Sequence, residues 1–191
     1  MGNCGDFVCC RKYNGKAKNK EDAAGRWGFM GHCDLPIVTV YNFLEHVKND
    51  VKPDLILWTG DSNSHNVWNS TQQETINVVT FLCMLMKNKF NYTMPVYPAI
   101  GNHEFFPADE FNPYNRTENE VTFNLTANLW RDWIGDEACH KYLEFGFYSI
   151  YNKELNLRVI AMNTMDCDTI NFNLIINPTD PAGQVNNQRN I

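Results

Sequence analysis

The sequence lacks any long apolar segment. No run in its 191 residues approaches the roughly 20 apolar residues that a membrane-spanning helix needs, because Lys, Asn or Gly interrupts the longest candidates. The N-terminus also lacks a basic region followed by an apolar one, so we expect no signal peptide within this chain. Acylation at Gly2 is disfavoured, since Asp6 stands where the myristoylation pattern requires Ser or Thr.

Positive charge is also scarce, with 16 Lys and Arg against 22 Asp and Glu and a formal net charge of −6. Nucleic acids are bound by clustered Lys and Arg, so a nucleic acid is not expected as a partner. The one basic cluster, between Arg11 and Lys20, is interrupted by Asn and Gly and followed at once by Glu21 and Asp22. It predicts a solvated loop in preference to a binding arm.

Apolar residues make up 43% of the chain and aromatic residues 13%, enough to build a hydrophobic core and to exclude disorder. Four N-x-[ST] triplets predict glycan acceptors at Asn69, Asn91, Asn115 and Asn124. Single triplets arise by chance in an Asn-rich chain. Four of them beside a C-x4-C-C cluster favour a secreted or lysosomal protein.

Helical periodicity of apolar residues appears in three places. It predicts a helix that begins at an N-cap on Asp34 and is closed by Pro53, and a long helix over 71–87. A further helix carries Trp130. Residues 1–33 lack this period and are expected to be a cysteine-tethered loop region. Residues 105–119 lack it as well and are expected to be a loop excursion. The helical period is also absent from the tail after Gln184.

Strand patterns alternate with these helices. Continuous apolar runs over 55–58 and 95–100 are typical of buried parallel strands. The runs over 147–151 and 157–161 predict paired strands joined by a turn. Alternating strands and helices, with polar loops after the strands, predict an α/β layered fold.

The loops that end the two buried strands hold the first site candidate. Asp61 follows a glycine after the first strand, and Asn102, His103 and Glu104 follow a glycine after the second. Ligands of open α/β sheets gather beyond the carboxyl ends of the strands, where glycine allows sharp turns. Oxygen donors with nearby imidazoles suit a dinuclear metal centre that attacks phosphorus. A lone Gly-Asp is usually only a turn, but the Asn-His pair and His65 favour the metal site.

Six segments carry a recognisable pattern: Trp58-Thr-Gly-Asp61-Ser-Asn-Ser-His65-Asn-Val-Trp68, Val96-Tyr-Pro-Ala-Ile-Gly-Asn102-His103-Glu104, Asn177-Pro-Thr-Asp-Pro-Ala-Gly-Gln184, Cys4-x4-Cys9-Cys10-Arg11, Ala24-Gly-Arg-Trp-Gly28 and Cys33-Asp-Leu-Pro36. Taken together, they resemble the catalytic domain of acid sphingomyelinase and the acid-sphingomyelinase-like phosphodiesterases. The resemblance runs in order along nearly the whole chain and marks this branch of the calcineurin-like metallophosphoesterases. It implies their fold, a layered β-sandwich flanked by helices.

The resemblance also implies a chemistry. Two zinc ions would bind the substrate phosphate and activate a bridging hydroxide, hydrolysing a phosphodiester such as sphingomyelin to ceramide and phosphocholine. Asp61 matches the carboxylate that bridges both metals, and Asn102 matches a ligand of one. His103 and His65 match catalytic histidines that stabilise charge or assist the leaving oxygen. Glu104 is expected to orient the loop without taking part directly.

By the resemblance, parts of the family pattern would fall outside these 191 residues, namely an Asp-x-His motif before Met1 and Gly-His and Gly-His-Thr-His motifs beyond Ile191. We therefore expect residues 1–191 to be a partial catalytic domain. Asp61 and Asn102 cannot hold two zinc ions by themselves, so the isolated chain is expected to bind zinc weakly and hydrolyse little. The remaining histidines match no ligand position and are expected at the surface: His32, His46 and His140.

The resemblance implies pairings for the cysteines: Cys4 with Cys9, Cys10 with Cys33, and Cys167 with a cysteine outside this chain. A zinc knuckle built from the first four is the alternative, disfavoured because C-x4-C-C lacks the usual C-x2-C spacing. Cys83 lies on an apolar helix face and is expected to be a buried thiol. Cys139 has no assigned place.

The sequence thus favours a secreted or lysosomal zinc phosphodiester hydrolase with a phosphodiester substrate, which can be a membrane lipid reached by peripheral contact. A related phosphodiesterase acting on nucleotides or other phosphoesters stays open, because the matched residues handle only the phosphate. A truncated, non-catalytic glycoprotein is the alternative from another class. Four aromatic residues near the motifs are expected to pack in the core or brace loops, with substrate contact as the alternative: Trp27, Trp68, Phe105 and Phe106. Sequence does not indicate the oligomeric state.

Overall fold

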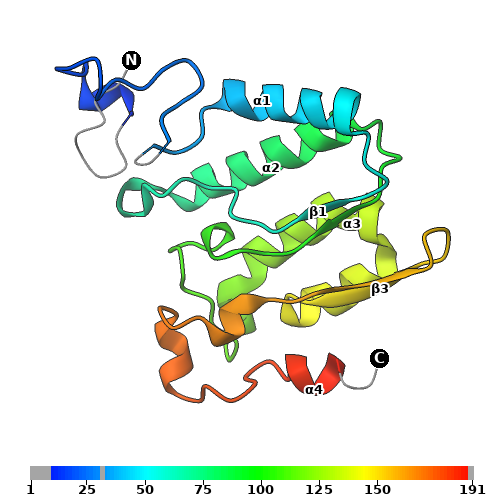
Figure 1. Cartoon of the computed structure of the whole chain (residues 1–191). Coiled ribbons are helices and arrows are strands. Elements are labelled where there is room, and N and C mark those ends of the chain that lie inside the picture. The colour runs from blue at the N-terminus through cyan, green and yellow to red at the C-terminus, as the bar shows by residue number, and fades with distance from the viewer. Residues whose placement is uncertain (1–9, 31–32, 189–191) are drawn as a thin grey trace. The chain divides into compact units, whose positions relative to one another are not determined.

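The structure, a computed structural model, describes residues 10–30 and 33–188 of the chain (Figure 1). Its internal contacts divide the chain into two compact units. The first runs to Pro53 and includes Ser64–Trp68, and the second comprises Asp54–Asn63 and Asn69–Ile191. Each unit is described by itself.

The described residues of the first unit form a short 3-10 helix, η1 (Lys12–Asn14), and the helix α1 (Ile37–His46), which continues as a π-helical turn, η2 (Val47–Val51). The N-cap of α1 is Pro36, so the prediction that Asp34 caps this helix is wrong. The Asp34 carboxylate is engaged instead by side chains distant in the sequence. Lys52 ends the helix in the left-handed region with a φ of 51°, directly before Pro53.

The second unit is built on a parallel strand pair and two long helices. Strand β1 (Ile56–Trp58) pairs in parallel with β2 (Val96–Pro98), as predicted, with Trp58 opposite Pro98. Strand β2 is buried as expected, but Leu57 of β1 is 62% exposed, so the predicted burial is wrong for β1. Helix α2 (Gln72–Lys89) begins with a capping box formed by Thr71 and Glu74. Helix α3 (Arg116–Phe145) begins at an N-cap on Asn115, so the predicted 105–119 excursion ends earlier than expected. Its two halves meet at a kink at Gly135, whose φ of 75° and ψ of 171° are not helical.

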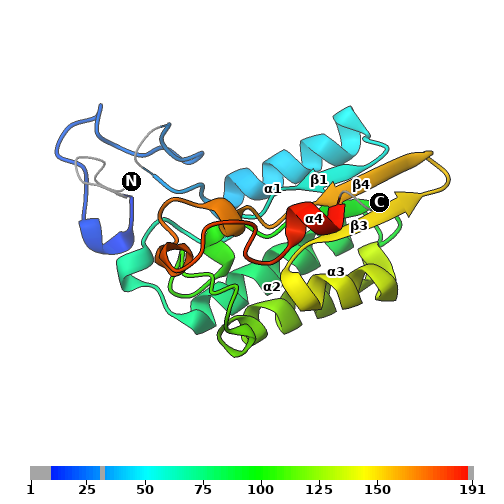
Figure 2. The same cartoon turned by 90° about the horizontal axis from the view of Figure 1, so that it is seen from below.

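The core of the second unit lies between these helices and the strands. Figure 2 shows α2 and α3 side by side, and Trp58 of β1 packs edge-on against Trp130 and Trp133 of α3. Cys83 is fully buried, which raises the pKa of its thiol to about 12, and the predicted buried thiol is confirmed. Cys139, for which the sequence indicated no place, is buried in the same cluster.

The rest of the second unit follows α3. Strands β3 (Tyr148–Asn152) and β4 (Leu157–Ala161) form the predicted antiparallel hairpin. Two 3-10 turns, η5 (Thr164–Cys167) and η6 (Phe172–Ile175), lead to a short helix, α4 (Gln184–Gln188), where the sequence indicated no helix. The α/β class is confirmed. Within the described part of the chain, no helix is long and apolar enough to cross a membrane.

Candidate metal site and its supporting turns

The polar loops after β1 and β2 meet because the two strands are parallel and in register. After β1 the backbone turns at Gly60, with a φ of 83°, and at Asp61, with a φ of 60°. A Cβ on Gly60 would overlap the backbone nitrogen of Gly101, and a Cβ on Gly101 would overlap the Asp61 carboxylate. The two glycines therefore let the loops approach more closely than any other residue would allow.

A buried carboxylate joins the two loops. Glu104, only 2% exposed, accepts hydrogen bonds through Oε2 from the backbone nitrogens of Asp61 at 2.9 Å and Gly101 at 2.8 Å. Its Oε1 accepts from the backbone nitrogen of Ser62 at 2.6 Å. Hydrogen bonds to an ionised acceptor are among the stronger ones in proteins. The expectation that Glu104 orients the loop agrees with these contacts.

The predicted metal ligands lie on these joined loops. The Asp61 side chain rests against Gly101 and the start of the 3-10 turn η4 (Asn102–Glu104), with its Oδ1 3.5 Å from the backbone nitrogen of His103. The side-chain nitrogen of Asn102 donates to Asp109 at 2.7 Å, which fixes the orientation of the Asn102 amide. His103 itself is buried. The fold thus gathers Asp61, Asn102 and His103 on adjoining turns.

The donor chemistry of these turns suits a hard or borderline divalent cation, since it offers a carboxylate and an amide oxygen. Among residues 10–30 and 33–188, however, no three His, Cys, Asp or Glu side chains come together as a group that could hold a metal ion. Asp61 and Asn102 therefore fit as part of a ligand set.

The other predicted catalytic histidine, His65, belongs to the first unit. Its Nδ1 lies 2.8 Å from Oδ1 of Asp34, and its backbone nitrogen donates to the same oxygen at 3.2 Å. The second oxygen of Asp34 accepts from the guanidinium of Arg11. Sequence reasoning missed both supporting residues, although each stands directly after a cysteine of one predicted disulfide.

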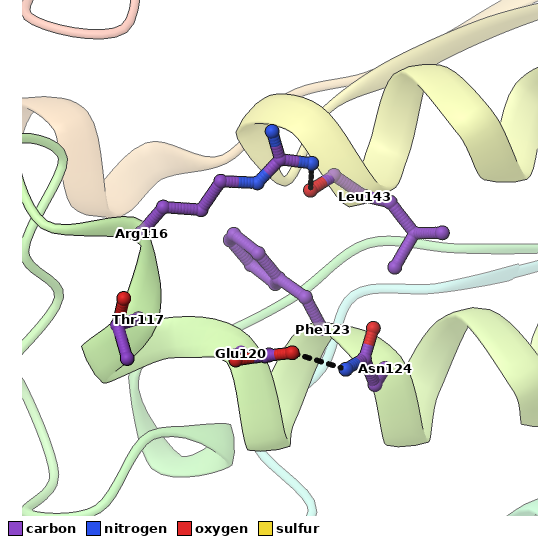
Figure 3. Close-up of a pocket in the computed structure, with 6 residues that line it drawn as sticks. All are labelled: Arg116, Thr117, Glu120, Phe123, Asn124 and Leu143. Atoms are coloured by element: carbon purple, nitrogen blue, oxygen red, sulfur yellow. Dashed lines mark hydrogen bonds between the residues drawn. The ribbon is translucent and has the colours of Figure 1, made fainter.

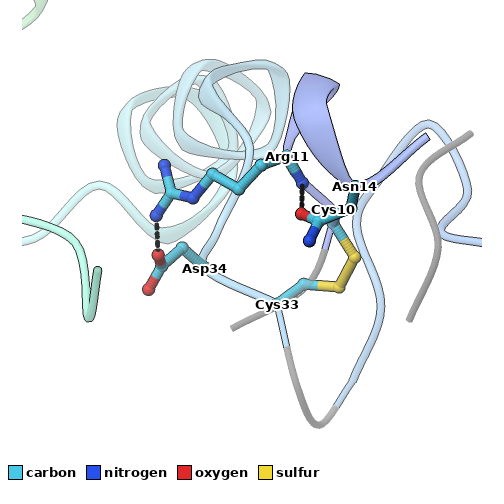
Figure 4. Close-up of a disulfide and its surroundings, with 5 residues drawn as sticks. All are labelled: Cys10, Arg11, Asn14, Cys33 and Asp34. Atoms are coloured by element: carbon cyan, nitrogen blue, oxygen red, sulfur yellow. Dashed lines mark hydrogen bonds and ion pairs between the residues drawn. A yellow bond between two sulfur atoms is a disulfide. The ribbon is translucent and has the colours of Figure 1, made fainter. Parts of the chain in front are cut away.

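That disulfide is present. Cys10 is bonded to Cys33, so this pairing is confirmed, and the zinc-knuckle alternative is wrong for these two cysteines (Figure 4). The pairing of Cys4 with Cys9 lies outside the described residues. Cys167 is an exposed free thiol that donates to the carbonyl of Thr164 at 3.3 Å, so its predicted partner stays a prediction.

The sequence also predicted that the sequon asparagines and three histidines lie at the surface. The four sequon asparagines are not buried, as glycan acceptors require: Asn69, Asn91, Asn115 and Asn124. His46 and His140 are exposed as expected, with Nδ1 of His46 2.7 Å from the Asp50 carboxylate, and His32 lies outside the described residues.

The four aromatic residues near the motifs differ in burial. Phe105 packs in the core, as expected. The other three are at least 41% exposed and do not belong to the core: Trp27, Trp68 and Phe106. Core packing is therefore the wrong interpretation for these three residues.

A pocket of about 340 Å³ lies along α3 (Figure 3). Its lining residues come from the start of that helix and from Leu143 near its end, and the Arg116 guanidinium donates to the Leu143 carbonyl at 2.9 Å. The lining includes the sequon residue Asn124 and none of the predicted metal or catalytic residues.

Comparison with known proteins gives consistent matches. Residues 32–180 match the model of the family described as calcineurin-like phosphoesterase. The chain is 36% identical over 186 residues to a sphingomyelin phosphodiesterase of Bos taurus and 36% identical over 185 residues to one of Homo sapiens. These matches cover 96% and 95% of this chain, and the chain spans 29% of the length of each relative. A cyclic GMP-AMP phosphodiesterase of Homo sapiens is 32% identical over 155 residues, covering 80% of this chain and 33% of that protein.

Proposed function

The chain belongs to the calcineurin-like phosphoesterase family, and on that premise we propose that it is part of a zinc-dependent phosphodiester hydrolase whose substrate is sphingomyelin. The family implies divalent metal ions, which supply a Lewis acid and an activated hydroxide when bound. Zinc is our choice among those ions. The observation that carries the proposal is the pair of loops joined by Glu104, which presents Asp61 and Asn102 side by side.

Each residue that the sequence predicted for the site has a proposed task. Asp61 would hold the metal ions through its carboxylate, and Asn102 would add an amide oxygen. His103 and His65 would donate hydrogen bonds to the substrate phosphate or a proton to the departing oxygen. The remaining metal ligands would come from protein outside these 191 residues, since the chain spans 29% of the sphingomyelin phosphodiesterases that it resembles.

The choice of sphingomyelin rests on the names of the relatives at 36% identity. The relative named cyclic GMP-AMP phosphodiesterase, at 32% identity, supports a second candidate, a phosphodiester between nucleotides. Both substrates contain the same reacting group, so the Asp61 and Asn102 loops serve either. For the lipid, peripheral contact with a membrane surface would be required.

We further propose that the protein is secreted or lysosomal and carries N-linked glycans at the four sequon asparagines. Support comes from the Cys10–Cys33 disulfide, which is typical of oxidising compartments, together with the accessibility of the sequons. Enzymatic removal of N-glycans from protein secreted by eukaryotic cells should increase its electrophoretic mobility. Unchanged mobility would contradict this part of the proposal.

The test of the proposed function is a substrate comparison with the full-length protein. We expect hydrolysis of sphingomyelin in mixed vesicles to exceed hydrolysis of a nucleotide phosphodiester, to be abolished by a chelator, and to return with zinc. Faster hydrolysis of the nucleotide would favour the second candidate. No hydrolysis of either substrate in the presence of zinc would contradict the proposed function.

A matched pair of variants connects the activity to the loops. Asp61→Asn should lower kcat by about 100-fold or more, because a neutral amide cannot replace the negatively charged carboxylate that would hold the metal ions. Asp54→Asn alters an exposed carboxylate before β1 and should leave kcat within about twofold. Equal effects of the two substitutions would contradict the role of Asp61.

A further inference from the structure

The disulfide of the first unit brings two charged residues together. Cys10 and Cys33 are bonded, and the residues that follow them, Arg11 and Asp34, lie side by side and form an ion pair (Figure 4). The backbone nitrogen of Arg11 also donates to the side chain of Asn14 at 2.9 Å, which ties Arg11 to the 3-10 turn η1. The Asp34 carboxylate is thereby held from one side by a covalently closed turn.

The other oxygen of Asp34 holds His65. The hydrogen bond from the backbone nitrogen of His65 to Asp34 fixes the position of the His65 backbone. The contact of 2.8 Å between Asp34 and Nδ1 fixes the orientation of the ring. The Asp34 side chain is only 21% exposed, whereas the His65 side chain is 71% exposed. A shielded carboxylate therefore presents an imidazole to the surroundings of the first unit.

This contact selects the position of the imidazole proton. A carboxylate oxygen can only accept a hydrogen bond, so Nδ1 of His65 must carry a hydrogen. In the neutral ring Nε2 is then an acceptor, and in the imidazolium it is a donor, as a group that exchanges a proton with a substrate requires. Arg11 compensates the charge of Asp34 and keeps its second oxygen occupied.

A purely structural role would need only the bond to the His65 backbone. We propose that Asp34 is a positioning residue for His65, and that the Cys10–Cys33 disulfide with Arg11 forms the support that holds it. The inference rests on the proposed function only for the consequence that His65 takes part in hydrolysis. The proton position on His65 can be tested without any activity.

The first experiment measures imidazole nitrogen chemical shifts by NMR in the 191-residue chain labelled with nitrogen-15. We expect His65 to show one protonated Nδ1 and Asp34→Asn to convert it to the tautomer mixture of a solvated imidazole. The matched control is Asp50→Asn, because Asp50 also contacts an Nδ1, that of the exposed His46, in the same unit. An unchanged His65 spectrum in Asp34→Asn, with the other histidine signals intact, would overturn the proposal.

The second experiment uses kinetics of the full-length protein. Asp34→Asn should lower kcat about 10- to 100-fold with little change in KM, and Asp34→Glu should restore part of the loss. In a His65→Ala background Asp34→Asn should have no further effect, because the two residues act as one unit. Losses that multiply in the double variant would overturn the positioning role. Absence of hydrolysis in the unmodified protein would contradict the proposed function and leave the NMR result to decide the proposal.

The third experiment concerns the support. Replacing both disulfide cysteines by serine, Cys10→Ser with Cys33→Ser, should shift the His65 nitrogen signals in the same direction as Asp34→Asn, by a smaller amount. Arg11→Gln should act likewise, since it removes only the ion pair. An unchanged His65 spectrum in both variants would remove the disulfide and Arg11 from the proposed support.

Discussion

Two carboxylates, Glu104 and Asp34, hold proposed site residues in different ways. Glu104 is buried and binds three backbone nitrogens, so it fixes the path of the chain around Asp61. Asp34 is partly exposed and binds the side chains of Arg11 and His65 as well as one backbone nitrogen. A carboxylate that binds the backbone shapes a site, whereas one that binds an imidazole also selects where its proton lies. Loss of the Glu104 carboxylate should therefore lower the stability of the fold, and loss of the Asp34 carboxylate should lower the rate of hydrolysis.

The largest effect is expected from Glu104→Ala. It would leave three backbone donors without their acceptor, so we expect a loss of about 3–5 kcal/mol in the free energy of unfolding. Urea denaturation of the 191-residue chain measures this value. Glu144→Ala, at an exposed glutamate of α3, should change it by less than about 0.5 kcal/mol. A loss below about 1 kcal/mol in Glu104→Ala would show that Glu104 does not hold the loops.

Substitution of a loop glycine should cause the next largest loss of stability. Gly60→Ala combines a strained positive φ with an overlap against Gly101, and we expect a loss of about 2–4 kcal/mol. Gly135→Ala is the matched control, because Gly135 has a φ of 75° and open space around its Cβ position. It should lose less than Gly60→Ala, because only the backbone cost of its φ of 75° and ψ of 171°, about 1–3 kcal/mol, applies there. Equal losses in the two variants would show that the close approach of the loops does not matter.

A third carboxylate sharpens the comparison. Asp166 is buried in η5, and its two oxygens have no hydrogen-bond partner among the described residues. Burial, with the nearby charge of Asp180, raises the pKa of Asp166 to about 7. A pKa raised above its unfolded value stabilises the fold at low pH, and this stabilisation is lost as the pH rises through about 7.

The pH dependence of stability that Asp166 causes can be measured through the melting temperature, Tm. The Tm of the chain should fall by several degrees between about pH 5 and pH 8, and Asp166→Asn should flatten most of this dependence. Asp54→Asn serves as the exposed control and should keep the slope. A Tm that rises over this range, with the rise abolished in Asp166→Asn, would contradict a raised pKa of Asp166.

The smallest effect on stability is expected from Asp34→Asn. The residue is partly exposed, so loss of its ion pair with Arg11 should lower the free energy of unfolding by about 1 kcal/mol or less. Urea denaturation of the Asp34→Asn and Glu104→Ala variants in parallel compares the two carboxylates directly. A loss as large as that of Glu104→Ala would show that Asp34 shapes the fold and does not mainly position His65.

The secondary structure could be predicted from the sequence where the signal is local. Strands β1 and β2 follow from continuous apolar runs, and the helix face that buries Cys83 follows from helical periodicity. Asp34 was wrongly predicted as an N-cap because its partners lie 23 and 31 residues away, and side-chain pairing over that distance leaves no pattern in the sequence. The burial of Asp166 was missed for a different reason, because a charged residue is expected at the surface.

The candidate site was predicted in part. The positions of Asp61 and Asn102 followed from the glycines that end two apolar strands, because parallel strands bring such turns to one edge. The bonds from Glu104 to the backbone could not be predicted residue by residue, since they depend on the positive φ values of Gly60 and Asp61. The full ligand set could not be predicted either, because two side chains do not suffice to hold a dinuclear centre.

The most direct test of the central claim, that the loops joined by Glu104 present Asp61 to metal ions, is the zinc content of the purified full-length protein. We expect about two zinc ions per molecule of the unmodified full-length protein. Asp61→Asn should lose most of this zinc while Asp54→Asn keeps it. Full zinc content in a folded Asp61→Asn protein would contradict the account.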